Sequence, residues 1–595
     1  MCRYRIPEIN CSLMKIFSRL YRLIENNPGK AFALTCLFLT AYQLISVFWG
    51  FELCDSGFYM TFYDHIFDAP ESVQYNFMYY LSGVVGGAFM ALFPDAGIFG
   101  IRLLGVATNL LAAALVYGLL RNRIPVSAII IGVSLVVISY AALPMAFYND
   151  LLTCLLYLLA LFCLFEGLRR DSNLYFVIGG CVVALNTFAR IPNLLDYGIV
   201  LLVILHQLYY KESVRRCVVR CSIFTLSFLA GIAGILLWMK PWGHYDYFLN
   251  NLQDLFSVAG DDSATNAHTL ANMIGAQVRI YGRVFKFGVK ILLIYGVLYG
   301  TRRYVKTILL RLPVQLVAFL LLAILFYREN AVIVLSVFSL IGLIGNIILA
   351  DSKEIKMLSW AGLSMMLIIP LGSDGGMFNN GSIIYWLGLP LAVSFFFSVK
   401  NKILPPALSV QNAGKTLGFT LGIYVLACVA KTAVGGVYFD GGTLFEKRFA
   451  IRNERTKHVY TTRERARIIN DLLEGIEPYI KEGDCLFAYG SIPAVNYMTR
   501  TKPFIGCSWP ELLSLPLLKQ KLENYTGTLP AILRQKFDSI GPEFGLPDEN
   551  YLVDCGVESG SFKSNEKSRV VNEFMEKNNY RIVFENQYFA LFLPQ

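Results

Sequence analysis

Charged residues are scarce in this sequence. Only 16% of the 595 residues are charged, 55% are hydrophobic, and the mean hydropathy is +0.52. Typical soluble domains carry about 25% charged residues. The shortage of charge excludes a disordered, collagen-like or disulfide-framework protein and argues against a soluble enzyme. It predicts that a large part of the chain lies in lipid.

Several motifs are absent as well. The 13 cysteines form no CxxC pair and no Cys/His cluster with zinc spacing. No Gly-rich phosphate fingerprint follows a predicted strand. No A-x-A cleavage site follows the first apolar run, residues 31–49, so we expect an uncleaved first span. No cofactor is therefore expected; a divalent metal stays an alternative that no motif indicates.

The charged residues divide the chain into two parts. Residues 440–595 hold 20 Lys+Arg and 21 Asp+Glu, whereas residues 1–439 hold 32 and 21. The net charge of +10 thus comes from the apolar part, where Lys and Arg in short loops mark the cytoplasmic side of a membrane. We expect a transmembrane domain over 1–439, a soluble domain over 440–595, and no nucleic-acid partner.

Apolar runs long enough for a bilayer core about 30 Å thick occur fourteen times. They lie near residues 31–49, 77–93, 98–119, 126–142, 150–167, 173–188, 193–210, 220–239, 286–300, 308–327, 331–350, 357–371, 383–398 and 416–435.

Alternation of the basic loops decides how many runs cross. With fourteen crossings, Arg121, Arg123 and every later basic loop would face the side opposite the basic N-terminus. The alternation is restored if the run at residues 77–93, which contains three glycines, does not cross the membrane. We therefore predict a re-entrant or juxtamembrane segment there and about 13 spans in an inner (plasma) membrane. The N-terminus is then cytoplasmic and the C-terminal domain extracytoplasmic.

Acidic side chains are predicted at the outer membrane edge. Glu52 and Asp55 follow the first span three residues apart, so on a helical end they would share a face. Asp150 opens another span. A carboxyl that apolar surroundings desolvate gains a raised pKa and can act as a base near neutral pH. The structural alternatives are a solvated span end for Glu52 and Asp55 and a helix cap for Asp150.

Basic and polar groups are predicted on the same side. Arg190 ends an outward-facing span, and a guanidinium there suits phosphate oxygens, although it would also suit headgroups. Arg279 and Arg283 belong to a long aromatic and basic outer loop, 240–285, that fits an interfacial helix or a lipid phosphate. Asp374 lies in the polar, Gly-rich loop 372–382, which suits a hydroxyl-rich ligand or a plain hairpin.

These residues together resemble the GT-C superfamily of membrane glycosyltransferases, and most closely its protein O-mannosyltransferase and aminoarabinose-transferase type. That family marks the exit of its first span with Asp-Glu-x-x-Tyr, similar to Asp55-Ser56-Gly57-Phe58-Tyr59. Asp150 and Arg190 match an acidic and a basic position of the family. The family's Lys-Pro before the juxtamembrane helix is replaced by residues 74–77, Gln-Tyr-Asn-Phe.

The resemblance implies about thirteen spans and a polyprenyl-phosphate sugar donor. It implies Asp55 as the catalytic base and Tyr59 as a substrate-binding residue. The expected reaction is inverting sugar transfer to a lipid, glycan or protein acceptor at the outer face of the cell envelope. Arg190, with Arg279 or Arg283, would hold the leaving phosphate, and Asp150 with Glu52 would orient the acceptor or tune Asp55.

Two other functions stay open: an O-antigen-ligase or polymerase-like transferase with a lipid-diphosphate donor, and a flippase or transporter of lipid-linked glycans.

The C-terminal region predicts a small α/β domain. Residues 463–480 read as an amphipathic helix and 484–490 as a buried strand. Residues 551–554 are a predicted strand, 561–577 a capped helix, and 581–584 with 589–593 a closing hairpin. The expected fold is thus a polytopic, mainly α membrane protein with a C-terminal soluble α/β domain.

Overall fold

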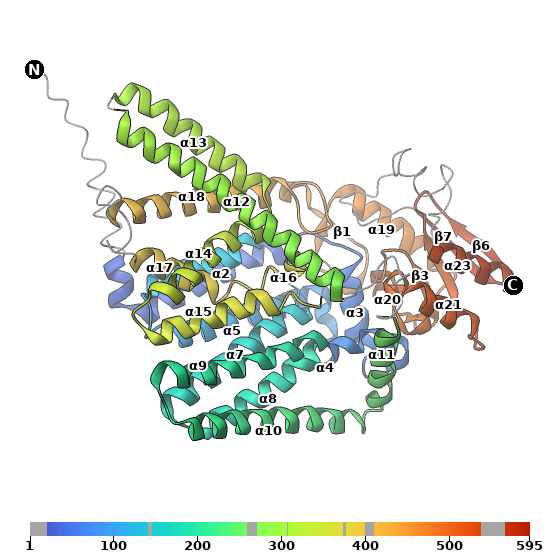
Figure 1. Ribbon diagram of the computed structural model, residues 1–595. Coiled ribbons are helices and arrows are strands. Elements are labelled where there is room, and N and C mark those ends of the chain that lie inside the picture. Colours follow the sequence, from blue (N-terminus) through green and yellow to red (C-terminus); the bar gives the residue numbers. More distant parts are fainter. Residues whose placement is uncertain are drawn as a thin grey trace, which may run out of the picture.

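The computed structural model describes residues 19, 21–140, 146–258, 270–305, 307–372, 376–398, 410–536 and 566–595 (Figure 1). The fold is mainly helical, and its strands lie in the C-terminal region. The helices before that region are α2 (Pro28–Phe48), α3 (Asp55–His65), η1 (Pro70–Tyr79), α4 (Tyr80–Leu92), η2 (Pro94–Ala96), α5 (Gly97–Leu120), α6 (Val126–Ser139), α7 (Asn149–Arg170), α8 (Asn173–Ala189), η3 (Ile191–Val200), α9 (Leu201–Tyr210), α10 (Val214–Met239), α11 (His244–Val258), α12 (Leu270–Tyr304), α13 (Ile308–Arg328), α14 (Ala331–Leu349), α15 (Lys353–Ile368), α16 (Met377–Asn380), α17 (Gly388–Ser398) and α18 (Val410–Val434).

Eight helical segments among the described residues are long and apolar enough to cross a membrane by length and composition. They are Pro28–Phe48, Pro94–Leu120, Asn149–Arg170, Ile191–Tyr210, Val214–Met239, Ile274–Thr301, Leu309–Arg328 and Ala331–Leu349. Four shorter apolar helices accompany them: Val126–Ser139, Asn173–Ala189, Gly388–Ser398 and Thr420–Val434. All fourteen predicted apolar runs overlap helical segments, and the number that cross stays a prediction.

Helix α4 covers the predicted re-entrant run and has only 13 residues. At 1.5 Å per residue it reaches about 20 Å, short of a bilayer core. Its glycines form a flat face against α3: a Cβ on Gly86 would lie 2.5 Å from the Tyr63 ring, and one on Gly83 would lie 2.2 Å from Phe62. The glycines therefore allow close helix packing here.

One end of the helix bundle gathers the basic loops. Arg123 pairs with Glu354 at 2.7 Å, which joins the α5–α6 loop to the start of α15. Arg220 pairs with Asp171 at 2.6 Å, which joins α10 to the α7–α8 loop. Lys353 lies 4.9 Å from the Tyr210 ring at the end of α9. The C-terminal region lies at the opposite end of the bundle (Figure 1).

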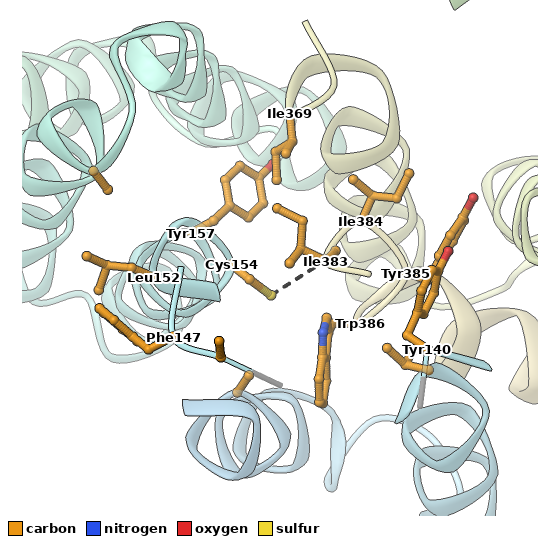
Figure 2. Packing of buried hydrophobic residues seen from close by; sticks show 14 of the residues in the cluster. Tyr140, Phe147, Leu152, Cys154, Tyr157, Ile369, Ile383, Ile384, Tyr385 and Trp386 are labelled. Atoms are coloured by element: carbon orange, nitrogen blue, oxygen red, sulfur yellow. Dashed lines mark hydrogen bonds between the residues drawn. The ribbon is translucent and has the colours of Figure 1, made fainter. Parts of the chain in front are cut away.

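The helix bundle contains a buried non-helical segment. Residues 381–387 form turns before α17, although the sequence predicts a span from residue 383. Ile383, Ile384, Tyr385, Trp386 and Leu387 are 0–1% exposed, and Figure 2 shows this segment facing α7. The Tyr385 hydroxyl donates to the Val332 carbonyl at 2.8 Å, and the Cys154 thiol contacts the Ile383 carbonyl at 3.6 Å. Irregular backbone at such a depth is tolerated because protein surrounds it.

The C-terminal region forms a five-stranded mixed sheet in the order β4-β3-β5-β7-β6. Its strands are β3 (Cys485–Tyr489), β4 (Lys502–Pro503), β5 (Ala531–Gln535), β6 (Tyr580–Glu585) and β7 (Phe589–Pro594), and a small pair joins β1 (Phe449–Ala450) to β2 (Tyr460–Thr461). The helices are α19 (Arg463–Ile476), α20 (Ala494–Thr499), α21 (Leu515–Glu523) and α23 (Glu566–Lys577), with short 3-10 turns η5 to η8 between residues 444 and 512.

The sequence predictions for this region agree with these elements. The predicted helix 463–480 is α19, which ends at Ile476, the predicted strand is β3, and the predicted hairpin is the antiparallel pair β6–β7. The predicted strand 551–554 lies outside the described residues. The sequence analysis missed β5, which pairs in parallel with β3.

The sheet region packs directly on α3. The Ala494 amide donates to the Leu53 carbonyl at 3.0 Å, and the Cys54 thiol contacts the Ser491 carbonyl at 3.3 Å. A Cβ on Gly57 would lie 2.0 Å from the Ala494 nitrogen, so only glycine permits this approach. Farther along α3, Arg455 pairs with Asp64 at 2.5 Å. The boundary predicted at 439/440 is therefore bridged by a tight interface.

Candidate active site

The loop between α2 and α3 carries the first two predicted site residues. Glu52 is 1% exposed, and its carboxylate accepts hydrogen bonds from the Ser56 amide and, at 2.5 Å, from the Cys54 amide. The Ser56 amide belongs to the first turn of α3, where a carboxylate satisfies unpaired N–H groups and the helix dipole. Glu52 thus fixes the start of α3, whose first residue is Asp55.

Asp55 has a different environment. Its side chain is partly exposed, and its Oδ2 accepts a hydrogen bond of 2.7 Å from the Tyr438 hydroxyl. Burial raises the pKa of Asp55 above its ordinary value, and the Tyr438 hydrogen bond opposes that rise. Burial, and next the charge of Asp55, raises the pKa of Glu52 to about 7. The two carboxyl groups therefore share a site where both resist ionisation.

Asp150 lies on the first turn of α7, as the sequence predicts. Its side chain is 25% exposed, and its Oδ1 accepts a hydrogen bond of 3.0 Å from the Asn380 side-chain Nδ2. The Arg190 Nη1 lies 3.8 Å from the same oxygen. The helix-cap interpretation does not account for these contacts, since both reach Asp150 from other parts of the bundle: α16 and the end of α8.

Tyr59 joins α3, which begins at Asp55, to the first turn of α7, which carries Asp150. Its hydroxyl donates a hydrogen bond of 2.6 Å to the Oδ1 of Asn149, the residue that precedes Asp150. Its ring stacks on Tyr148 with centroids 4.6 Å apart, and the Tyr148 hydroxyl lies 2.8 Å from the Ser56 Oγ. Burial raises the pKa of both tyrosines, with smaller contributions from the nearby carboxylates, so both hydroxyls remain protonated donors near neutral pH.

Arg190 is held by the loop that follows α15. It is 5% exposed, and its Nη2 donates to the carbonyls of Ile369 and, at 3.1 Å, of Leu371. Its Nε is buried and has no hydrogen-bond partner among the described residues. An unsatisfied buried guanidinium N–H is costly, and an anionic oxygen is its natural partner.

Arg279 and Arg283 do not join this cluster in the structure. Both lie on the exposed side of α12. Arg283 pairs with Glu329 at 3.0 Å, and its guanidinium lies 5.3 Å from the Phe378 ring in α16. Phe378 is two residues from Asn380, so Arg283 and Asp150 contact the same short helix, α16. Asp374 lies outside the described residues.

Several groups at the site were not predicted from the sequence. Asn380 supports Asp150, and Tyr438 supports Asp55. Asp196 is buried in η3 within a candidate span, and its Oδ2 accepts a hydrogen bond of 2.8 Å from Asn186. An acidic residue inside an apolar run was a usable signal for Asp196, and the paired glycines around residues 435–442 were one for Tyr438.

The described residues contain no group of three or more His, Cys, Asp or Glu side chains that could hold a metal ion. The clustered side chains offer instead one accessible carboxylate at each of two helix starts, aromatic rings between them, and a guanidinium with a free donor. Such a set can accept a proton from a hydroxyl and stabilise an anionic leaving group.

Comparisons with known proteins give distant structural similarity. No family model matches this chain, and no curated protein matches it. The oligosaccharyltransferase of Archaeoglobus fulgidus in complex with Zn and sulfate is 14% identical, over 66% of this chain and 52% of that one, with a TM-score of 0.39. The same enzyme tethered by a disulfide bond to an acceptor peptide containing the NVT sequon is 12% identical, over 80% and 65%, with a TM-score of 0.43.

This chain thus spans between half and two thirds of the length of those solved chains. Both TM-scores lie below 0.5, so the chemistry of the site has to be derived from this chain's own residues.

Proposed function

We propose that this protein is an inverting glycosyltransferase that moves a sugar from a polyprenyl-phosphate donor to an acceptor hydroxyl. The reaction would take place at the outer face of the membrane. One observation carries the proposal: at the bundle end that bears the C-terminal region, Arg190 lies 3.8 Å from Asp150, and Tyr59, on the helix that Asp55 begins, donates a hydrogen bond to Asn149 beside Asp150.

In this reaction Asp55 takes the proton from the acceptor hydroxyl. The acceptor oxygen attacks the anomeric carbon of the sugar from the face opposite the phosphate, and the bond from that carbon to the phosphate oxygen breaks. The electron pair stays on the lipid phosphate. Arg190 would meet that growing negative charge with its Nε–H, which has no partner among the described residues, and Asp150 would orient the acceptor.

The arrangement of charge supports the orientation. The basic loops gather at the bundle end opposite the C-terminal region, and basic loops mark the cytoplasmic side. The candidate site would then face outward, with the C-terminal region beside it. A transporter would place its ionisable groups near the middle of the membrane instead, whereas Asp55 and Asp150 each begin a helix.

The test is sugar transfer by the purified full chain. A synthetic polyprenyl phosphate with a radiolabelled sugar is mixed with acceptor-containing membranes, and label in the product is counted for the wild type and Asp55→Asn. The amide cannot accept the proton, so transfer should fall by at least about 10²-fold. Asp68→Asn is the matched control, since Asp68 is 65% exposed and lies on the surface beside His65, at 3.5 Å.

Three results would contradict the proposal. Equal transfer by the wild type and Asp55→Asn would remove Asp55 from catalysis. Transfer from a polyprenyl-diphosphate sugar alone would favour the ligase or polymerase type of enzyme, and movement of the intact lipid across vesicles without transfer would favour a flippase.

A further inference from the structure

A short turn after the last apolar helix reaches into the candidate site. The amide of Val437 donates to the Asp440 carbonyl at 3.1 Å, and the Asp440 amide donates back to the Val437 carbonyl at 2.9 Å. This pair of bonds leaves Tyr438 and Phe439 at the tip of a two-residue turn. Phe439 has a φ of +53°, which a side-chain-bearing residue rarely adopts, so the surroundings must hold the turn in place.

The turn is packed against the loop that carries Asp55. Gly50 has a φ of +88°, and a Cβ there would lie 2.6 Å from the Val437 side chain. The Gly50 amide also donates to the Tyr460 carbonyl at 2.8 Å in the C-terminal region. The turn, the loop and the strand β2 are therefore packed closely against one another.

The buried side chain of Asp440 holds the turn in place. Its side chain is 0% exposed, and its Oδ2 accepts hydrogen bonds from the Phe51 amide at 2.8 Å and the Thr461 hydroxyl at 2.7 Å. Its Oδ1 lies 3.1 Å from the Lys447 Nζ and 3.5 Å from the Arg465 Nε. One buried carboxylate thus ties the turn to the Asp55 loop on one side and to the C-terminal region on the other.

The turn places Tyr438 next to Asp55. Its hydroxyl donates to the Asp55 Oδ2 at 2.7 Å, and its ring lies against Phe439 with centroids 3.9 Å apart. A hydrogen bond donated to a carboxylate favours the ionised, proton-accepting form and fixes the direction of its second oxygen.

We infer that Tyr438 is a positioning residue for Asp55, and that the turn 436–442 is the arm through which the C-terminal region sets the direction and ionisation of that carboxylate. The inference rests on the proposed role of Asp55 as the base. It assigns the C-terminal region a part in the chemistry in addition to any contact with the acceptor.

The other titratable groups around Asp55 define the background. They include Glu52 in the same loop, Tyr59 on α3, Tyr148 before α7 and Asp150 on α7. Two buried cations, Arg102 on α5 and Arg465 on α19, donate hydrogen bonds to backbone carbonyls of that loop. A substitution at position 438 leaves all of these side chains in the protein. Burial opposes ionisation of Asp55, and the Tyr438 hydrogen bond is the interaction that offsets it.

The experiment titrates Asp55 directly. The full chain carrying Glu52→Gln, so that one carboxyl of the pair remains, is followed by infrared spectroscopy between pH 3 and 9. The carboxylic-acid band lost with Asp55→Asn is assigned to Asp55. In Tyr438→Phe its midpoint should move to higher pH by about one unit, a tenfold loss of acidity.

A second substitution covers the case in which the phenylalanine variant does not fold. With 3,5-difluorotyrosine at position 438 the hydroxyl is retained and is a stronger donor, so the midpoint should move to lower pH. Tyr424→Phe is the matched control, since the Tyr424 hydroxyl on α18 donates to the neutral Ser139 Oγ at 2.8 Å and should leave the midpoint unchanged.

Unchanged midpoints in both position-438 variants would overturn the inference, and so would an equal shift in Tyr424→Phe. The titration needs no substrate, so this failure is distinct from a failure of the proposed function. In the transfer assay, Tyr438→Phe should move the acid limb of the pH profile in the same direction as the infrared midpoint. A merely structural role would lower the rate without moving that limb.

Discussion

Removing the charge of Asp440 tests how the C-terminal region is attached to the candidate site. Asp440→Asn keeps the shape of the side chain and one acceptor oxygen for the Phe51 amide or the Thr461 hydroxyl. It leaves Lys447, 0% exposed, and Arg465, 3% exposed, as buried cations without their carboxylate. Breaking a buried ion pair from one side costs about 3–5 kcal/mol.

Amide hydrogen exchange measures that cost where it arises. A loss of about 3 kcal/mol in local opening should speed exchange of the amides in residues 49–54 by about 10²-fold in the purified full chain. Thermal unfolding in the same detergent should begin at a lower temperature. Glu474→Gln is the control. Glu474 is 57% exposed and its partner Arg452 is 76% exposed, so their ion pair should contribute at most about 1 kcal/mol to stability.

A second substitution separates unpaired charge from lost shape. Asp440→Asn combined with Lys447→Met removes one stranded cation, so at least half of the lost protection should return. Exchange rates in Asp440→Asn that match the wild type would refute the reasoning. So would a double variant that is less protected than Asp440→Asn alone, since that would make Lys447 favourable without its partner.

Three further predictions concern titration, orientation and packing. Because burial and Asp55 raise the pKa of Glu52 to about 7, its protonated form stabilises the fold at low pH, and that contribution is lost as pH rises toward 7. The thermal midpoint of Glu52→Gln should therefore rise relative to that of the wild type between pH 5 and 8. A constant difference between the two midpoints would contradict the assignment. In a cysteine-free background, Asn122→Cys should react with an impermeant maleimide only from the cytoplasmic side and Glu482→Cys only from outside; labelling of both from one side would contradict the orientation. Gly57→Ala should lower the thermal midpoint by the equivalent of about 1–3 kcal/mol, since its Cβ would lie 2.0 Å from the backbone of α20, and an unchanged midpoint would contradict the tight interface.

Several site residues could be predicted because the chemistry forces them to stand out locally. Asp55, Asp150 and Arg190 are ionisable groups at the ends of apolar runs; in the structure Arg190 lies 3.8 Å from Asp150, and Tyr59 on the helix of Asp55 donates a hydrogen bond to Asn149. Arg279 and Arg283 had the same signal, yet they lie on the exposed side of α12, and Arg283 pairs with Glu329. Local sequence places a residue along its helix, but packing decides which way that helix faces.

The role of Glu52 shows the same limit. Spacing of three residues predicted that Glu52 and Asp55 would share a helical face, but the helix begins at Asp55 and Glu52 caps it from the preceding loop. The capping hydrogen bonds use its carboxylate oxygens. Glu52 is therefore better suited to fixing α3 than to contacting substrate.

The sequence by itself determined the helical segments, the polar C-terminal region and the candidate acids at the helix ends. Hydrophobicity and charge act over a few residues and are readable from composition. Only the tertiary structure decided that Tyr438 and Asp440, nearly 400 positions away, would complete the Asp55 loop. Contacts between distant segments depend on how the whole chain closes, and no local pattern encodes which buried donor will meet a given carboxylate.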